Sequence, residues 1–302
     1  MSMNNDNVTK LINTLKDKNQ ILALRLLAIE QLAEKPEVEE SIQALLGALS
    51  DDKQEIRAYA AEMLGKMGSK KALFPLIDSL HDLSYEVRVS ALRSLALLKD
   101  EQAIEHIAKR ILDQSDKVRY EAVKALASFD SIQIIKPLFE ALSDENEAVK
   151  NKAERVLLGL KLSDKISEEL VISFLKHTNP FIRDVATRFI TFRLIGSAVP
   201  LLVKQTYDKN WEVKLSALQE LNKIVAVKAE NREQIIECCL KCLDDNNPKI
   251  KMESIDILRE LKAEEAINKL IIISTKDPDE RVRFEAIDAI TEIRRAKRLT
   301  TE

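Results

Sequence analysis

The chain has 302 residues, of which 45% are hydrophobic, 32% are charged and 4% are aromatic, and its formal net charge is −3. This charge balance does not favour nucleic-acid binding, because attraction to phosphate requires a clear excess of Lys and Arg. No apolar run approaches the roughly 18 residues of a membrane span, and the polar start of the chain is unlike a signal peptide, so we expect no membrane partner.

The composition predicts a helical protein. Five Gly and seven Pro are few for this length, whereas Ala, Leu, Glu and Lys are common. These are strong helix formers, and Gly and Pro are the residues that interrupt helices. Three Cys without the spacing of a disulfide framework indicate a reduced, cytoplasmic location.

One short pattern recurs nine times. Each copy begins with an aliphatic anchor, which is usually followed directly by Arg or Lys. A small residue stands four positions after the anchor, and Leu or Ile stands eight positions after it. The anchors are 31 to 37 residues apart and are Leu24, Ile56, Val87, Val118, Val149, Ile182, Val213, Ile250 and Val282. A period of this size predicts a repeat solenoid. The widest step predicts a longer turn within residues 225–233.

The third copy, residues 69–98, shows what one repeat contains. Leu73, Leu76, Ile77 and Leu80 recur at helical spacing and predict a first helix, which we call helix A. A polar turn over residues 83–86 precedes a second helix over 87–98, which we call helix B. Because neither helix can bury its apolar stripe alone, neighbouring repeats must stack. The sequence therefore predicts one all-α solenoid of about nine helical hairpins over residues 1–302.

Charges of opposite sign flank most anchors. An acid stands five residues before the anchor, as Asp51, Asp82, Asp113, Asp144, Asp208, Asp245 and Asp277. A base follows the anchor, as Arg57, Arg88, Arg119, Lys150, Lys214, Lys251 and Arg283. Recurrence in nearly every repeat favours a structural role, either as caps of helix B or as a ladder of ion pairs, over a binding strip. The sixth copy has His177 in place of the acid, so one rung is expected to be missing there.

This order of acid, turn, aliphatic anchor, base and Ala resembles the HEAT repeat, in the short form of about 31 residues known from phycobilisome lyases. The resemblance extends from Leu11 to about Ile293. It implies an α-α superhelix of the HEAT-like or armadillo type, with the B helices lining its concave side. It is specific for fold and weak for function, because such arrays serve as scaffolds, adaptors, transport receptors and occasionally enzymes.

The variable positions of helix B predict where a partner binds. Counting the anchor as position 1, position 7 points away from the core at 100° per residue. Position 7 holds four bases in succession, Arg93, Lys124, Arg155 and Arg188, with acids or Gln in the other copies. Position 3 lies on the same face and supplies the apolar residues Val89, Tyr120 and Leu215.

These columns predict a non-enzymatic scaffold or adaptor that captures a partner protein, an acidic peptide or helix, in a concave groove. The plain alternative is a solvated face whose charges pair with one another. Trp211, the only Trp, lies in the turn of the seventh repeat and is a candidate anchor for a partner, or a local cap on its own helix. The oligomeric state stays open.

Catalytic chemistry is not predicted. Cys238, Cys239 and Cys242 include a CxxC spacing but fall within a helix A, where buried free thiols are the favoured interpretation. Zinc would need further ligands, and the three His are isolated. No catalytic or phosphate-binding motif occurs, so we expect no enzyme activity, cofactor or metal. Two alternatives stay open: a lyase-type or chaperone-like helper of a tetrapyrrole-carrying protein and, less favoured, a nucleic-acid-binding HEAT-like protein.

Overall fold

The computed structural model describes residues 2–161, 166–191, 198–225 and 231–301, and no strand occurs among them. These residues form two compact units, Met1–Asp164 and Lys165–Glu302, which we call unit 1 and unit 2. Part of the longer turn expected within residues 225–233 lies outside the described residues. A single array over residues 1–302 stays a prediction.

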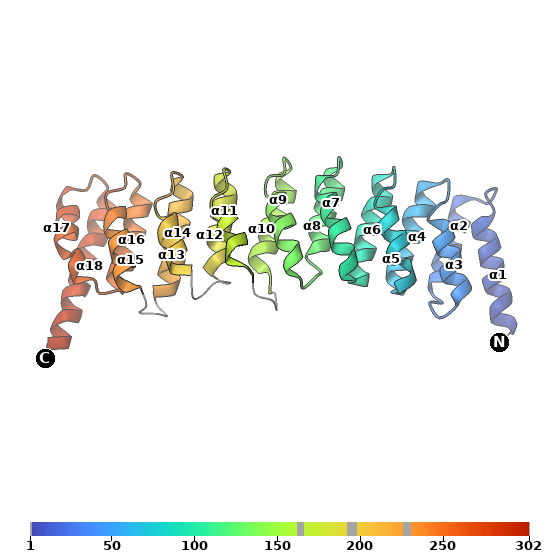
Figure 1. The fold of residues 1–302 in the computed structure, drawn as a ribbon, viewed down its shortest axis with the longest axis horizontal. Coiled ribbons are helices and arrows are strands. Elements are labelled where there is room, and N and C mark those ends of the chain that lie inside the picture. The colour runs from blue at the N-terminus through green and yellow to red at the C-terminus, as the bar shows by residue number, and fades with distance from the viewer. Residues whose placement is uncertain (1, 162–165, 192–197, 226–230, 302) are drawn as a thin grey trace. The chain divides into compact units, whose positions relative to one another are not determined.

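The described residues of unit 1 form five helical hairpins, in which odd-numbered helices are the A helices and even-numbered helices are the B helices (Figure 1). The helices are α1 (Ser2–Lys16), α2 (Leu22–Ala33), α3 (Glu39–Ala48), α4 (Gln54–Met67), α5 (Leu73–Ser79), α6 (Tyr85–Leu98), α7 (Ile104–Lys109), α8 (Asp116–Leu126), α9 (Ile135–Ala141) and α10 (Glu147–Gly159). Short 3-10 segments occur at Lys70–Ala72, Glu101–Ala103, Arg110–Leu112 and Ile132–Ile134.

Unit 2 repeats the same alternation in four hairpins. Its helices are α11 (Glu168–Leu175), α12 (Pro180–Thr191), α13 (Ala198–Gln205), α14 (Trp211–Val225), α15 (Arg232–Cys242), α16 (Pro248–Glu260), α17 (Ile267–Lys276) and α18 (Glu280–Thr301), with a 3-10 segment at Glu264–Ala266. Every predicted anchor lies in an even-numbered helix. The all-α fold of the α-α superhelix class is confirmed.

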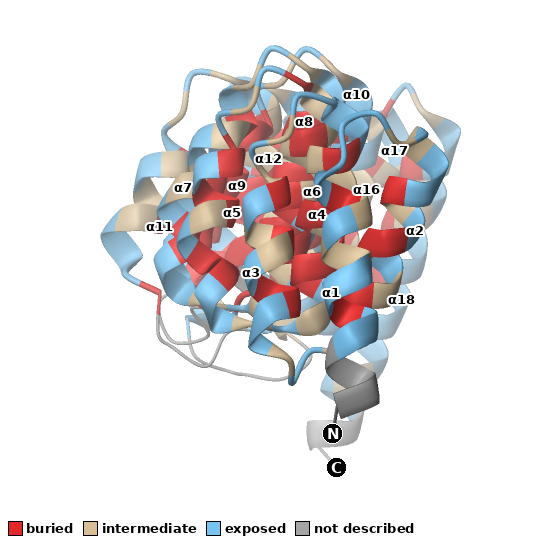
Figure 2. Ribbon diagram, turned by 90° about the vertical axis from the view of Figure 1, so that its right-hand side faces the viewer, coloured by how far each residue is buried: buried red, intermediate tan, exposed pale blue. Residues whose placement is uncertain are grey.

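The repeated positions form the core. Each B helix packs against the A helix of its own repeat, as α6 does on α5, and within each unit against the next B helix, as α6 does on α8. Figure 2 shows the buried residues gathered on the helix faces that meet one another. The small residue at position 5 is buried in all nine copies, and every anchor but Leu24 is buried. Leu24, in the B helix of the first repeat, is 42% exposed.

The charged columns form a ladder of ion pairs within each unit, as predicted. Among the described residues, seven bases that directly follow an anchor, including Arg25 after Leu24 and Arg183 after Ile182, pair with the acid of the following repeat. The pairs are Arg25–Asp51, Arg57–Asp82, Arg88–Asp113 and Arg119–Asp144 in unit 1, and Arg183–Asp208, Lys214–Asp245 and Lys251–Asp277 in unit 2. The acid also accepts the amide N–H two residues later, as Asp82 does from Ser84 at 2.8 Å. It therefore braces the A–B turn, and a separate residue such as Asn146 caps helix B.

Two residues stand where the column departs from its pattern. Lys150 of unit 1 pairs with Glu147 of its own helix. In unit 2, His177 keeps the turn by accepting the Asn179 amide N–H on its Nδ1 at 3.0 Å. Arg183 donates to the carbonyl of His177 at 2.8 Å, as Arg57, Arg88 and Arg119 do to the acid carbonyls of their own turns. The imidazole thus replaces the turn-bracing part of the missing acid.

Candidate functional site

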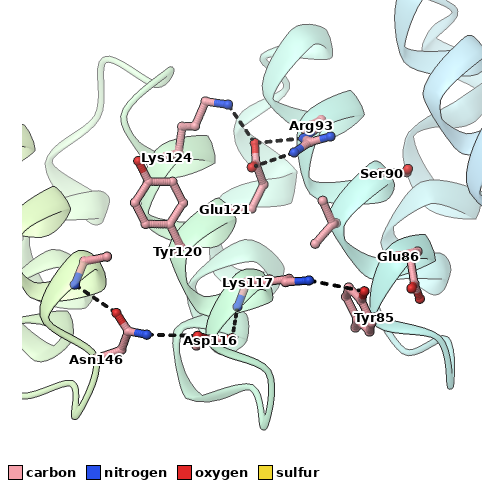
Figure 3. Close-up of a pocket in the computed structure, with 12 residues that line it drawn as sticks. Tyr85, Glu86, Ser90, Arg93, Asp116, Lys117, Tyr120, Glu121, Lys124 and Asn146 are labelled. Atoms are coloured by element: carbon pink, nitrogen blue, oxygen red, sulfur yellow. Dashed lines mark hydrogen bonds and ion pairs between the residues drawn. The ribbon is translucent and has the colours of Figure 1, made fainter.

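A hollow of about 580 Å³ opens on the B-helix side of unit 1, between α6 and α8 (Figure 3). We call it the α6–α8 hollow. Its lining residues are Tyr85, Glu86, Val89, Ser90 and Arg93 of α6, Asp116, Lys117, Tyr120, Glu121 and Lys124 of α8, and Asn146 and Ala148 at the start of α10. Four of the seven predicted groove residues, Val89, Arg93, Tyr120 and Lys124, therefore lie in one hollow.

One end of the hollow is basic. Arg93 and Lys124 reach it from facing helices, and their side chains are 54% and 52% exposed. Both contact the carboxylate of Glu121, with Arg93 Nε at 3.2 Å and Lys124 Nζ at 3.1 Å from Oε1. Glu121 is only 7% exposed and lies between the two bases in Figure 3. A molecule that approaches from solvent therefore meets two cations, with their shared anion behind them.

The other end is aromatic and carries charges of both signs. Lys117 Nζ lies 4.9 Å from the centre of the Tyr85 ring, a cation–π contact between successive repeats. The Asp116 carboxylate accepts a hydrogen bond from Asn146 Nδ2 at 2.9 Å. The Ser84 hydroxyl, hydrogen bonded to Glu86 at 2.6 Å, lowers the pKa of that carboxyl, which keeps it ionised at neutral pH. Val89 and Tyr120 also line the hollow, and Figure 3 shows the Tyr120 ring between Lys124 and Asn146.

The other three predicted groove residues lie elsewhere. Arg155 of α10 is exposed, donates to the Asn151 carbonyl at 3.3 Å and lines a separate hollow of about 310 Å³. Arg188 and Leu215 belong to unit 2, where both are half-buried. Arg188 Nη2 contacts Asp184 of its own helix at 2.6 Å, so a carboxylate partly offsets its charge. A continuous stripe of four bases stays a prediction.

Trp211 is the first residue of α14 and is 42% exposed. Lys249 Nζ of the following repeat lies 5.5 Å from the centre of its ring. Tyr85 and Lys117 form the same contact at equivalent positions of unit 1, at 4.9 Å. This recurrence indicates a local contact between repeats, and the role of Trp211 as an anchor for a partner stays a prediction.

The three cysteines are buried free thiols, as predicted. Burial raises the pKa of Cys242 to about 11, which keeps this thiol protonated at neutral pH. Within the described part of the chain, no three His, Cys, Asp or Glu side chains lie close enough together to hold a metal ion. None of the described helices combines the length and the apolar character needed to cross a bilayer.

Sequence reasoning missed the central role of Glu121. Its signal is visible in retrospect, because Glu121 precedes Lys124 by three residues, the spacing at which helix side chains meet. The contact to Arg93 of the preceding repeat could not be read from that spacing. It depends on how α6 and α8 pack, which brings position 7 of one repeat next to position 4 of the following one.

Comparison with known structures supports the same fold. Kap95p, in a structure with RanGDP, matches with a TM-score of 0.53 and 15% identity, covering 94% of this chain and 44% of that chain. Kap95 in complex with Nup1 matches with a TM-score of 0.52 and 14% identity, covering 94% and 46%. The chain thus spans less than half the length of these proteins. An engineered protein matches at 20% identity and a TM-score of 0.44, covering 95% and 88%. No curated protein sequence matches.

The model of the HEAT repeat family matches residues 8–96, 74–157 and 199–291. These regions include more than half of the chain and all but one of the nine anchors. The chain belongs to the HEAT repeat family.

Proposed function

We propose that this protein is a non-enzymatic scaffold that binds a partner protein on its B-helix face, and that the α6–α8 hollow receives an acidic segment of the partner. The observation that carries the proposal is the exposure of Arg93 and Lys124 above a nearly buried Glu121. HEAT-repeat structures of similar fold, Kap95p with RanGDP and Kap95 with Nup1, hold protein partners, which supports protein binding in general.

The charge arrangement favours an anion at one end of the hollow. Two half-exposed bases share one carboxylate, so one positive charge remains without an opposite charge in that cluster. A carboxylate of the partner would complete the pairing at modest desolvation cost, because Arg93 and Lys124 still face water. Such partly exposed pairs contribute more to specificity and association rate than to affinity.

The spacing along the helices sharpens the proposal. Val89 precedes Arg93 by one helical turn on α6, and Tyr120 precedes Lys124 by one turn on α8. Each apolar residue is therefore about 6 Å from its base along the helix axis, the rise of four residues. A partner helix with an apolar residue and an acid four positions apart matches this distance. The apolar contacts would supply buried area, and the bases would fix the orientation.

The test is affinity capture from a nuclease-treated native lysate with the wild-type chain and with R93E/K124E. We expect the double variant to lose at least tenfold of the bound partner, because two carboxylates would repel an acidic segment. The control is K71E/K136E, which changes the net charge equally at two exposed lysines outside the hollow. Extending the reversal to Arg155 and Arg188 tests the remaining predicted bases.

A partner that binds wild type and R93E/K124E equally would contradict the proposal. Equal loss in R93E/K124E and in the control would indicate attraction to net charge alone and would also contradict a defined site. Circular dichroism of each variant shows whether the helices are intact. Adding 0.5 M salt should weaken capture only moderately if apolar contacts contribute as proposed.

A further inference from the structure

Two leucines occupy turn positions at which other repeats carry different side chains. Directly after the ladder acid, the third repeat has Leu83, whereas the other copies from the second to the ninth have Asp52, Gln114, Glu145, Thr178, Lys209, Asn246 and Pro278. Directly before the acid, the fourth repeat has Leu112, whereas the others have Ser50, His81, Ser143, Lys176, Tyr207, Asp244 and Lys276. Leu83 is 99% exposed and Leu112 is 81% exposed. The core of this unit does not require either leucine.

Both leucines line one hollow of about 370 Å³ at the A–B turns of unit 1. We call it the turn-edge hollow, and it shares no residue with the α6–α8 hollow. Single exposed leucines are common on protein surfaces, but two at one depression form a small apolar patch. The depression favours insertion of a side chain over contact with a flat bilayer.

Apart from the ladder pairs, the ionisable side chains that line the turn-edge hollow are basic. Its acids, Asp82 and Asp113, are held by the ladder bases Arg57 and Arg88. Lys109 is 57% exposed, and its contact with Glu105 of the same helix, at 2.9 Å, is an exposed pair that water screens. Arg110 donates from Nη1 to the Leu80 carbonyl at 3.1 Å.

Among the described residues, the buried Nε of Arg110 has no hydrogen-bond partner. A buried N–H group without a partner is destabilising, so a hydrogen-bond acceptor from a bound molecule would be favourable at this atom.

We propose that the turn-edge hollow is a second protein-binding surface, which receives a short partner segment with a large apolar side chain next to a carboxylate. The apolar side chain would pack on Leu83 and Leu112, and the carboxylate would lie near Lys109 and Arg110. This surface is separate from the α6–α8 hollow, so the scaffold would hold two partner segments at once.

The test uses a library of random 12-residue peptides displayed on phage and selected on the full chain. Selected peptides are then titrated by fluorescence polarisation. In the variant L83Q/L112S, each leucine is replaced by the residue of another repeat, Gln114 or Ser50, so folding should be unaffected. The control is L97K, which removes an exposed leucine of α6 outside this hollow and introduces the residue that α4 has at the same position, Lys66.

We expect peptides that combine Leu, Ile, Met or Phe with a nearby Asp or Glu. Their Kd should rise at least tenfold in L83Q/L112S and stay within twofold in L97K and in R93E/K124E. The last comparison separates this surface from the α6–α8 hollow. The proposal is overturned if no selected peptide depends on the two leucines, or if the dependent peptides lack acids. It is also overturned if phosphatidylserine vesicles bind the wild type but not L83Q/L112S.

Discussion

Arg119 shows how one side chain joins two repeats. Its Nε and Nη2 donate to the Asp144 carboxylate of the next repeat at 2.7 and 3.0 Å. Its Nη1 donates to the carbonyl of Asp113 in its own turn, at 3.0 Å. A lysine in this column, such as Lys214, can reach the carboxylate but lacks the planar fork that serves both repeats.

We predict that Arg119→Met lowers the free energy of unfolding by about 3 kcal/mol, because it leaves the Asp144 carboxylate, 5% exposed, without its partner. The matched control is Lys150→Met in the same column, whose partner Glu147 is 74% exposed. This change should cost less than about 1 kcal/mol. Urea unfolding followed by circular dichroism measures both values.

The double variant R119M/D144N checks the cause of that loss. Removing the stranded charge should recover part of the stability, which the double-mutant cycle reports as a coupling energy. If Arg119→Met and Lys150→Met lower the free energy of unfolding equally, burial of the acid does not explain the contribution of the Arg119–Asp144 ion pair to stability.

At the scale of whole helices, the packing of α4 on α6 depends on Gly65. A Cβ added at Gly65 would lie 2.6 Å from the Cα of Ser94 on α6, so the two helix backbones would have to separate. Ser94 is itself buried and donates from its hydroxyl to the Ala61 carbonyl of α4 at 2.8 Å. The helices therefore meet at a point where no side chain fits on α4.

We predict that Gly65→Ala destabilises the protein by about 2 kcal/mol, although Ala favours a helix over Gly by about 1 kcal/mol. Gly47→Ala in α3 is the control, since nothing lies within 4 Å of its added Cβ. That variant should be neutral or up to about 1 kcal/mol more stable. Thermal unfolding of the two variants shows the contrast, and a stable Gly65→Ala protein would mean that α4 and α6 are not so closely packed.

The elements themselves could be predicted because they repeat. Every copy offers the same anchor and small residue, so nine weak signals combine into one strong periodicity. The ladder was also predictable, since its acids and bases recur at fixed places. Gly65 and the two leucines of the turn-edge hollow each occur in a single copy of the repeat, whereas Glu at the position of Glu121 recurs only as Glu253 and Glu285. The surroundings of all these residues come from neighbouring repeats. Sequence could name Arg93 and Lys124 as groove candidates, but only packing revealed their shared carboxylate.

For the molecule as a whole, the ladder sets the response to acid. Burial raises the pKa values of four ladder carboxyls, those of Asp51, Asp82, Asp208 and Asp245, but hydrogen bonds from the ladder base and from the turn amide outweigh this effect. The pKa values of Asp51, Asp82, Asp208 and Asp245 are therefore lowered below 3.8. The unfolded chain, with Asp near 3.9, then binds more protons than the folded chain in moderately acidic solution.

We predict that the stability from these carboxyls is fully present above about pH 5 and is lost as the pH falls below about 4, through their folded-state pKa values. Urea midpoints measured between pH 3 and 8 test this. Asp256 provides the contrast, because burial raises its pKa and its ionised form opposes folding at neutral pH. Asp256→Asn should therefore raise the midpoint at pH 7 and leave the loss below pH 4 in place. A decline that begins between pH 7 and 6 would assign the acid response to groups outside the ladder.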